Sequence, residues 1–190
     1  MYCVRSSSTA EETIRKSRFI SHMIPVSEPG DINSILRHLS AEHPNASHIA
    51  FAFRIKTTSG IVSRFFDAGE PAGTAGRPIY QHLEGKSIIN CMLAVIRYFG
   101  GIKLGAGGLA RAYGNTARLA IESNQLIPFV EYCKIRVVME YSQLQQLEYW
   151  LKKRNATIES RTYTESIELV ISLPADDADE LKRLVAKHDT

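Results

Sequence analysis

The sequence predicts an α+β protein of two domains, and three observations support this prediction. Strand-like and helix-like patterns of apolar residues alternate along the 190 residues. The charge changes sign, because residues 1–130 carry 14 Lys and Arg against 9 Asp and Glu, whereas residues 131–190 carry 9 against 11. Residues 126–130 contain a proline and are expected to be a linker. We therefore expect one domain over residues 1–125 and a second over residues 131–190.

The first half of the N-terminal domain is predicted to contain a strand, a helix and a hairpin. The strand covers residues 17–26, and the helix begins after Pro29 and ends before Pro44. The hairpin joins a strand over residues 47–56 to one over residues 61–66. Apolar residues alternate along the first of these strands, which places one face of it in the core: Ile49, Phe51, Phe53 and Ile55.

The second half of this domain is predicted to contain two helices around a buried strand. Thr74 is expected to cap a helix that runs to Glu84 and has Pro78 in its first turn. Residues 88–98 show little alternation, which indicates a central strand buried on both faces. A helix over residues 107–123 follows, and its small residues allow it to lie close to the sheet: Ala110, Ala112, Ala117 and Ala120.

The C-terminal domain has a different order of predicted elements. A strand over residues 132–140 precedes a leucine-striped helix, and strands over residues 156–163 and 167–173 precede a last helix. In that last helix Asp177 and Glu180 have the spacing of a capping box. This βαββα order in about sixty residues is similar to most of a ferredoxin-like fold and is compact enough for a separate domain.

Composition favours a cytoplasmic protein. No apolar stretch approaches the roughly 20 residues of a membrane-spanning helix, and the first residues, MYCVRSSSTAEETIRKSR, lack the apolar core of a signal peptide. Cys3, Cys91 and Cys133 lie far apart and form no CxxC pair, so neither a disulfide framework nor a zinc site is predicted. We therefore expect no membrane contact and no bound metal.

Ten of the twelve glycines lie between Gly69 and Gly114, and all of these except Gly85 belong to the clusters GEPAGTAGRP and GGIKLGAGGLARAYG. Gly105, Gly107 and Ala110 match a G-x-G-x-x-A pattern, but the second strand and the acidic residue of a dinucleotide-binding unit do not follow. A Walker loop is also absent, because no G-K-[ST] ending is present. The glycines would therefore allow another group to approach the backbone closely, but the segment matches neither the dinucleotide-binding pattern nor the Walker loop.

Cations in the glycine segment predict contact with an anion or a nucleic acid. Arg77 and Arg111 lie in the first turns of predicted helices, where the helix dipole disfavours a cation unless an anion is bound there. The predicted contact residues are Arg77, Arg97, Lys103, Arg111, Tyr113 and Arg118. A structural alternative stays open, in which these cations pair with Asp67 and Glu70 within a loop network.

No catalytic residue is predicted. The histidines lack metal-ligand spacing, the serines lack a G-x-S-x-G elbow, and Cys91 is expected to be a buried apolar residue. Asp67 and Glu70 could form an acid pair, although turn and capping roles are commoner for such loop residues. We therefore expect no catalysis and no cofactor.

The segment GEPAGTAGRP, followed by INCMLAVIRYFGGIKLGAGGLARAYG, closely resembles the signature of the YigZ/IMPACT family. The likeness extends from KSRFIS at Lys16 through the last helix. It implies an N-terminal α+β domain like one in a ribosomal protein and in domain IV of elongation factor G, and a C-terminal domain like domain V of that factor. The family's loop pattern, within residues 67–114, falls on Asp67, Gly69, Glu70, Gly73, Thr74, Gly76, Gly100, Gly101, Gly105, Gly107 and Gly108.

The resemblance implies a non-enzymatic protein that binds RNA or the ribosome and regulates translation. Eukaryotic members restrain a stress kinase through its activator, which implies a protein partner as a further alternative. A different hypothesis is an enzyme or sensor that binds a small phosphorylated or carboxylated ligand at the glycine-rich loops. The label of proline dipeptidase, given to some relatives, is not expected to apply, because the chain has no five-ligand dinuclear metal set. His48, Ile49, Ala50 and Ala68 depart from the pattern where relatives often have His, Cys and a second Asp.

Overall fold

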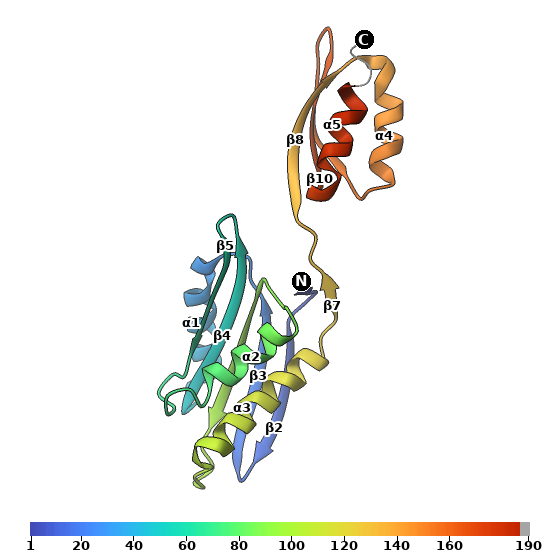
Figure 1. Cartoon of the computed structure of the whole chain (residues 1–190). Helices are drawn as coiled ribbons and strands as arrows, with labels where there is room; N and C mark the ends of the chain where they lie inside the picture. Colours follow the sequence, from blue (N-terminus) through green and yellow to red (C-terminus); the bar gives the residue numbers. More distant parts are fainter. Residues whose placement is uncertain (187–190) are drawn as a thin grey trace. The chain divides into compact units, whose positions relative to one another are not determined.

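A computed structural model describes residues 1–186, so residues 187–190 of the predicted C-terminal domain lie outside the described part. The chain divides into two compact units, of which the first is Met1–Phe129 and the second begins at Val130. Each unit combines a mainly antiparallel sheet with helices (Figure 1). The predicted α+β fold with two domains is confirmed.

The first unit is built on a five-stranded antiparallel sheet. The sequence prediction of a central strand buried on both faces is confirmed, because the third strand in the sheet is buried along almost its whole length. The two outermost strands each have one edge that pairs with no other strand of this sheet. Across the sheet the strands are β2 (Ser8–Ile14), β3 (Ser17–Pro25), β6 (Cys91–Tyr98), β4 (His48–Thr57) and β5 (Gly60–Phe66).

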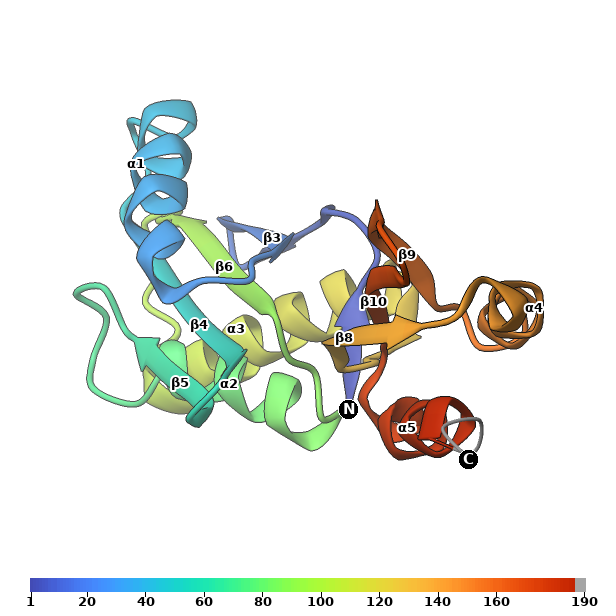
Figure 2. The same ribbon diagram turned by 90° about the horizontal axis from the view of Figure 1, so that it is seen from above.

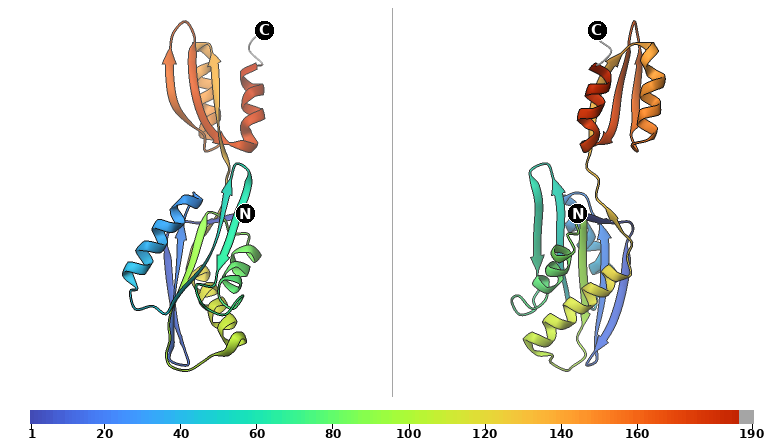
Figure 3. Two further views of the ribbon diagram at one scale, coloured as in Figure 1. Left: turned by 90° about the vertical axis from the view of Figure 1, so that its left-hand side faces the viewer. Right: turned by 45° about the vertical axis from the view of Figure 1, so that its right-hand side comes forward.

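Helices cover both faces of this sheet. Helix α1 (Ile32–Glu42) lies on one face, and α2 (Gly76–Gly85) and α3 (Gly105–Glu122) lie side by side on the other (Figures 2 and 3). Each face has its own apolar core. The core under α1 includes Phe51, Phe53, Ile55 and Met92, and the core under α2 and α3 includes Phe19, Leu93, Val95, Ile79 and Ala117.

Three strands of this unit were not predicted. Strand β2, with the sequence STAEETI, is mostly polar and lies at the sheet edge. Strand β1 (Tyr2–Val4) pairs with β7 (Leu126–Pro128), so the prediction that residues 126–130 form only a linker is wrong. Short strands paired across more than 120 residues carry no local periodicity that a sequence could reveal.

The predicted cap of α2 is also wrong. Thr74 lies two residues before the helix, and its hydroxyl donates to the Pro71 carbonyl at 2.7 Å rather than accepting from the helix. Ala75 occupies the N-cap position without a side-chain hydrogen bond. The donors at this helix start are instead satisfied from a distant loop residue, described below.

The second unit contains the predicted βαββα order. Strands β8 (Tyr132–Met139), β10 (Ile167–Pro174) and β9 (Thr157–Tyr163) form an antiparallel sheet in that spatial order. Helices α4 (Leu144–Lys152) and α5 (Ala178–Ala186) share one apolar core with the sheet. Alternate residues of β10 are fully buried, as expected for a strand with one covered face: Ile167, Leu169, Ile171 and Leu173.

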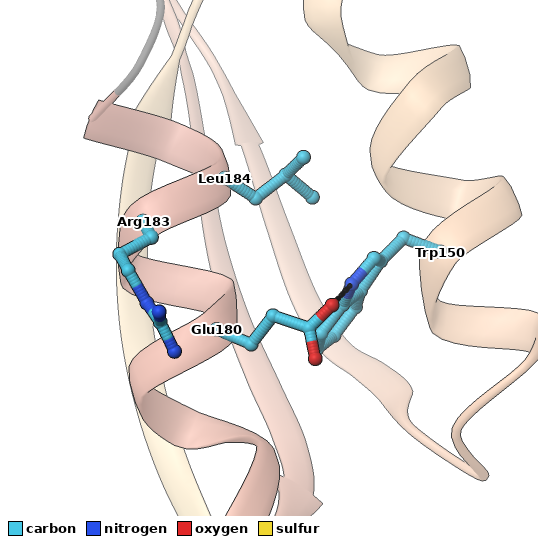
Figure 4. Close-up of a pocket in the computed structure, with 4 residues that line it drawn as sticks. All are labelled: Trp150, Glu180, Arg183 and Leu184. Carbon is cyan, nitrogen blue, oxygen red and sulfur yellow. Dashed lines mark hydrogen bonds between the residues drawn. The ribbon is translucent and has the colours of Figure 1, made fainter.

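Glu180 joins the two helices of this unit instead of serving a capping box. Its Oε1 accepts a hydrogen bond from Trp150 Nε1 at 3.1 Å (Figure 4) and one from Arg154 Nη2 at 2.5 Å. Arg154 also lies over the Trp150 ring, 4.5 Å from its centroid. A hollow of about 370 Å³ adjoins these residues. Trp150 and Glu180, which line it, already form a hydrogen bond with each other.

Candidate functional site

Glu70 is the centre of the folded glycine segment. Its Oε1 accepts a hydrogen bond from Arg97 Nη1 at 2.7 Å and another from the Tyr113 hydroxyl at 2.8 Å. Glu70 lies in the first glycine cluster, Arg97 near the end of β6 and Tyr113 in α3, so the carboxylate joins three separate segments. All three side chains are buried. A buried charge needs such partners, because burying it alone is very costly.

Further contacts surround this network. His48 Nε2 lies 3.9 Å from Glu70 Oε1, and the other ring nitrogen of His48 is 2.9 Å from the Ala68 carbonyl oxygen. The Ser17 hydroxyl accepts from the Gly100 N–H at 3.2 Å. Burial, followed by the negative charge of Glu70, raises the pKa of Tyr113, so its hydroxyl stays a hydrogen-bond donor at neutral pH. These contacts therefore hold the glycine segment against one end of the sheet.

Asp67 performs the capping role at α2. Its carboxylate accepts hydrogen bonds from the backbone N–H groups of Gly73 at 2.8 Å, Ala75 at 3.0 Å and Gly76 at 2.8 Å. Partial burial opposes ionisation of Asp67, but these three donors outweigh it and lower its pKa. The N–H groups of the N-cap residue Ala75 and of Gly76, the first residue of α2, are therefore satisfied inside the protein.

This geometry corrects part of the predicted contact set. Arg97 and Tyr113 do not face an external anion, because both donate to buried Glu70. Arg97 lies on the same side of β6 as Leu93 and Val95, which points it into the core. The start of α2 is likewise occupied by the carboxylate of Asp67. The Gly76 N–H at this helix start is therefore not free for an external anion, whereas the Arg77 side chain is exposed.

The structural alternative, an internal network, holds for the two acids and for Arg97 but not for Arg77, Lys103 and Arg111. Asp67 and Glu70 do belong to an internal network, yet their partners are backbone N–H groups, Arg97 and Tyr113. Arg77, Lys103 and Arg111 are exposed, and within residues 1–186 their side chains have no ion pair or hydrogen bond.

We use the term basic face for Arg77, Lys103, Arg111 and Arg118. Arg118 is half-buried and pairs with Glu122 at 2.6 Å. Helices α2 and α3 touch where a Cβ at Gly114 would lie 3.4 Å from His82 Nε2 and 3.8 Å from Pro78 Cβ. Burial, followed by the charges of Arg118 and Lys86, lowers the pKa of His82. The two helices thus present neighbouring cations to solvent.

The glycines of the signature have different roles. A Cβ at Gly100 would lie 2.0 Å from the carbonyl carbon and oxygen of Lys16, so no side chain fits there. Gly69 has φ +88°, a conformation that favours glycine, and it lies against the His48 ring. Gly107, in contrast, has open space around its Cβ position. Gly73 and Gly76 supply N–H groups to Asp67, Gly101 precedes α3, and Gly105 and Gly108 lie at its start.

The described residues offer little to metal chemistry or covalent catalysis. Residues 1–186 contain no group of three or more His, Cys, Asp or Glu that could hold a metal ion. Burial raises the pKa of the Cys91 thiol, so it is not a reactive thiolate. No helix in the described part of the chain is long and apolar enough to cross a membrane.

Both units of the chain match known domains. Residues 15–121 match the Impact N-terminal domain, and residues 137–187 match a domain of unknown function, DUF1949. The chain belongs to the IMPACT family. A family member of Haemophilus influenzae is 35% identical over 170 residues, which cover 89% of this chain and 82% of that protein. The member YigZ of Escherichia coli is 34% identical over 183 residues, with coverages of 94% and 88%.

Two solved structures are also similar to this chain. A crystal structure of a hypothetical protein aligns with 99% of this chain and 92% of its own, at 30% identity and a TM-score of 0.71. The two-domain translational regulator Yih1 aligns with 65% of this chain and 47% of its own, at 21% identity and a TM-score of 0.38. At that level the likeness to Yih1 carries no functional argument.

Proposed function

We propose that this IMPACT family protein is not an enzyme and regulates translation by binding RNA or the ribosome through the basic face. The observation that carries the proposal is the separation of charge within the glycine segment. Asp67 and Glu70 are turned inward and satisfied, whereas Arg77, Lys103 and Arg111 are exposed without an acidic partner among the described residues. Positive charge left uncompensated on one surface suits a phosphate backbone.

The number of cations sets the expected salt dependence of the binding affinity. Each phosphate that is neutralised contributes about 0.7 to 0.9 to the slope of log affinity against log salt. Four contacts from the basic face therefore correspond to a slope of about −3, or a loss of roughly 60-fold in affinity between 50 and 200 mM salt. Binding of this kind is reversible at physiological salt, as a regulator requires. We place the protein in the cytoplasm, where ribosomes are found.

Ribosome co-sedimentation of the full chain over a series of KCl concentrations tests this function. The expected result is recovery of the protein with the ribosomal pellet at low salt and steep release as salt rises. Purified ribosomal RNA serves as the second ligand, because it distinguishes contact with RNA from contact with ribosomal proteins. Absence of salt-sensitive binding to both ligands would contradict the proposal. A protein partner in translation control, the alternative that the family resemblance implies, would then be sought by pull-down.

A further inference from the structure

A hollow of about 450 Å³ lies at the free edge of β5, outside the network around Glu70. Its walls are Ser63, Arg64, Phe65, Phe66 and Tyr80. Both phenylalanines expose 43% of their surface, which is unusual for two adjacent large aromatic residues. Phe65 and Phe66 are adjacent in β5, so their rings lie on opposite faces of the sheet, Phe66 beside Phe51 and Phe65 beside Tyr80. We call Phe65 and Tyr80 the aromatic edge.

The rings of the aromatic edge are held in place. Phe65 and Tyr80 pack with their ring centroids 5.6 Å apart. The Tyr80 hydroxyl donates to Glu84 at 2.7 Å. Rings fixed in this way lose little conformational freedom when a ligand binds, so they are suited to present a flat surface.

Cations border these rings. Arg64 is exposed and has no ion pair or hydrogen bond among residues 1–186, but it is adjacent to Phe65 in β5 and therefore lies on the opposite face of the sheet. The Arg54 guanidinium lies 6.0 Å from the Tyr80 centroid. Arg77 of the basic face is three residues before Tyr80 in α2, which places the two on the same side of that helix. The acid beside the rings, Glu84, already accepts the Tyr80 hydroxyl. The charge around the aromatic edge therefore favours a polyanion.

We propose that the aromatic edge binds single-stranded RNA, with bases stacked on Phe65 and Tyr80 and phosphates beside Arg77. The proposal rests on the proposed function and names the form of RNA that is bound. Bases within a duplex are stacked on one another and cannot reach exposed rings, whereas unpaired bases can. Stacking on aromatic side chains together with a cationic path for the backbone is the usual design of single-strand binding.

Fluorescence anisotropy of the full chain with a labelled single-stranded RNA of about 12 nucleotides tests this proposal. The same sequence in a duplex is the comparison ligand. We expect tighter binding of the single strand and a loss of roughly tenfold in Phe65→Leu and in Tyr80→Leu, which keep apolar bulk but remove the ring. The salt slope should not change, because no phosphate contact is lost. Tyr149→Leu, at a residue 63% exposed in the second unit, is the matched control and should bind normally.

A second measurement uses the native chain and so does not depend on the folding of a variant. A single-stranded RNA with one 5-iodouridine is irradiated in the complex, and the cross-linked peptide is identified by mass spectrometry. The proposal predicts cross-links at Phe65 or Tyr80.

Three outcomes would overturn it. Equal binding of single strand and duplex, with cross-links elsewhere and unaffected variants, leaves the proposed function standing and refutes the aromatic edge. Absence of salt-sensitive binding to any RNA refutes both. Binding of an acidic peptide that Phe65→Leu abolishes, with RNA binding unchanged, would show that the open edge of β5 accepts a peptide strand instead.

Discussion

Arg97 and Glu70, separated by 27 residues in sequence, form a buried ion pair of 2.7 Å between the central strand of the first unit and the first glycine cluster. Tyr113 adds a second donor from α3 to the same carboxylate oxygen. The glycine signature therefore folds around an acid rather than around an external anion. The buried charged groups of the signature stabilise the fold. The groups available for contact with a ligand are the exposed cations on α2, on α3 and in the loop between β6 and α3.

Replacement Glu70→Gln should strongly destabilise the protein. The amide keeps the size of the side chain, but Arg97 is left as a buried charge without its counterion. Breaking one side of a buried pair costs about 3–5 kcal/mol. Urea unfolding followed by circular dichroism measures the change in the free energy of unfolding. Glu122→Gln, which removes the partner of Arg118 in an exposed pair, is the matched control and should cost about 0.5 kcal/mol or less. Equal effects of the two replacements would show that the buried pair is unimportant.

Asp67 should make stability depend on acid pH. Its pKa in the folded protein lies below the ordinary value of 3.8, so the ionised carboxylate stabilises the fold above that pH and this contribution is lost as pH falls through the lowered pKa. Asp67→Asn should therefore be less stable than the natural protein by about 1 kcal/mol at pH 7, with the difference shrinking as pH falls below 3.8. Urea midpoints at a series of pH values measure it.

Asp31→Asn is the control for the acid dependence, because Asp31 precedes α1 without making a side-chain cap. It should change stability little at any pH. A difference between Asp67→Asn and the natural protein that stayed constant from pH 7 to pH 3 would contradict the capping role of Asp67.

Two glycines of the signature should respond in opposite ways to alanine. Gly100→Ala places a Cβ in the backbone of Lys16 and should destabilise by about 3 kcal/mol or more. Gly107→Ala adds a Cβ in open space on α3 and should stabilise by about 0.5–1 kcal/mol, since alanine restricts the unfolded chain and favours a helix. Thermal unfolding of both variants checks the pair. Destabilisation by Gly107→Ala of similar size would mean that this glycine has a close neighbour in the folded protein.

Most of the fold could be predicted because its strands carry local patterns. The alternation of Phe51, Phe53 and Ile55 identified β4, and the continuous apolar run identified β6 as the central strand. Strand β2 lacked such a signal, and the pairing of β1 with β7 depends on residues at opposite ends of the first unit. Non-local pairing of short strands leaves no trace in a window of sequence.

The site was predicted less well than the fold. The glycine segment stays a predicted site, but the prediction that Arg97 contacts an external anion is wrong, because its side chain is buried against Glu70. Its spacing of two and four residues from Val95 and Leu93 was a signal that it points into the core. The contribution of Ser17 could not be found in the same way, because its contact with Gly100 crosses 83 residues of sequence. Spatial convergence of this kind requires the folded chain.

The salt dependence of RNA binding by a variant of the basic face tests the central claim most directly. Arg77→Ala, Lys103→Ala and Arg111→Ala are combined in one chain, and Arg37→Ala, an exposed cation on α1 at the opposite face of the sheet, is the control. The account predicts that the slope of log affinity against log salt becomes shallower by about 2 to 3 in the triple variant and stays unchanged in the control. An unchanged slope in the triple variant would contradict the assignment of RNA contact to these cations.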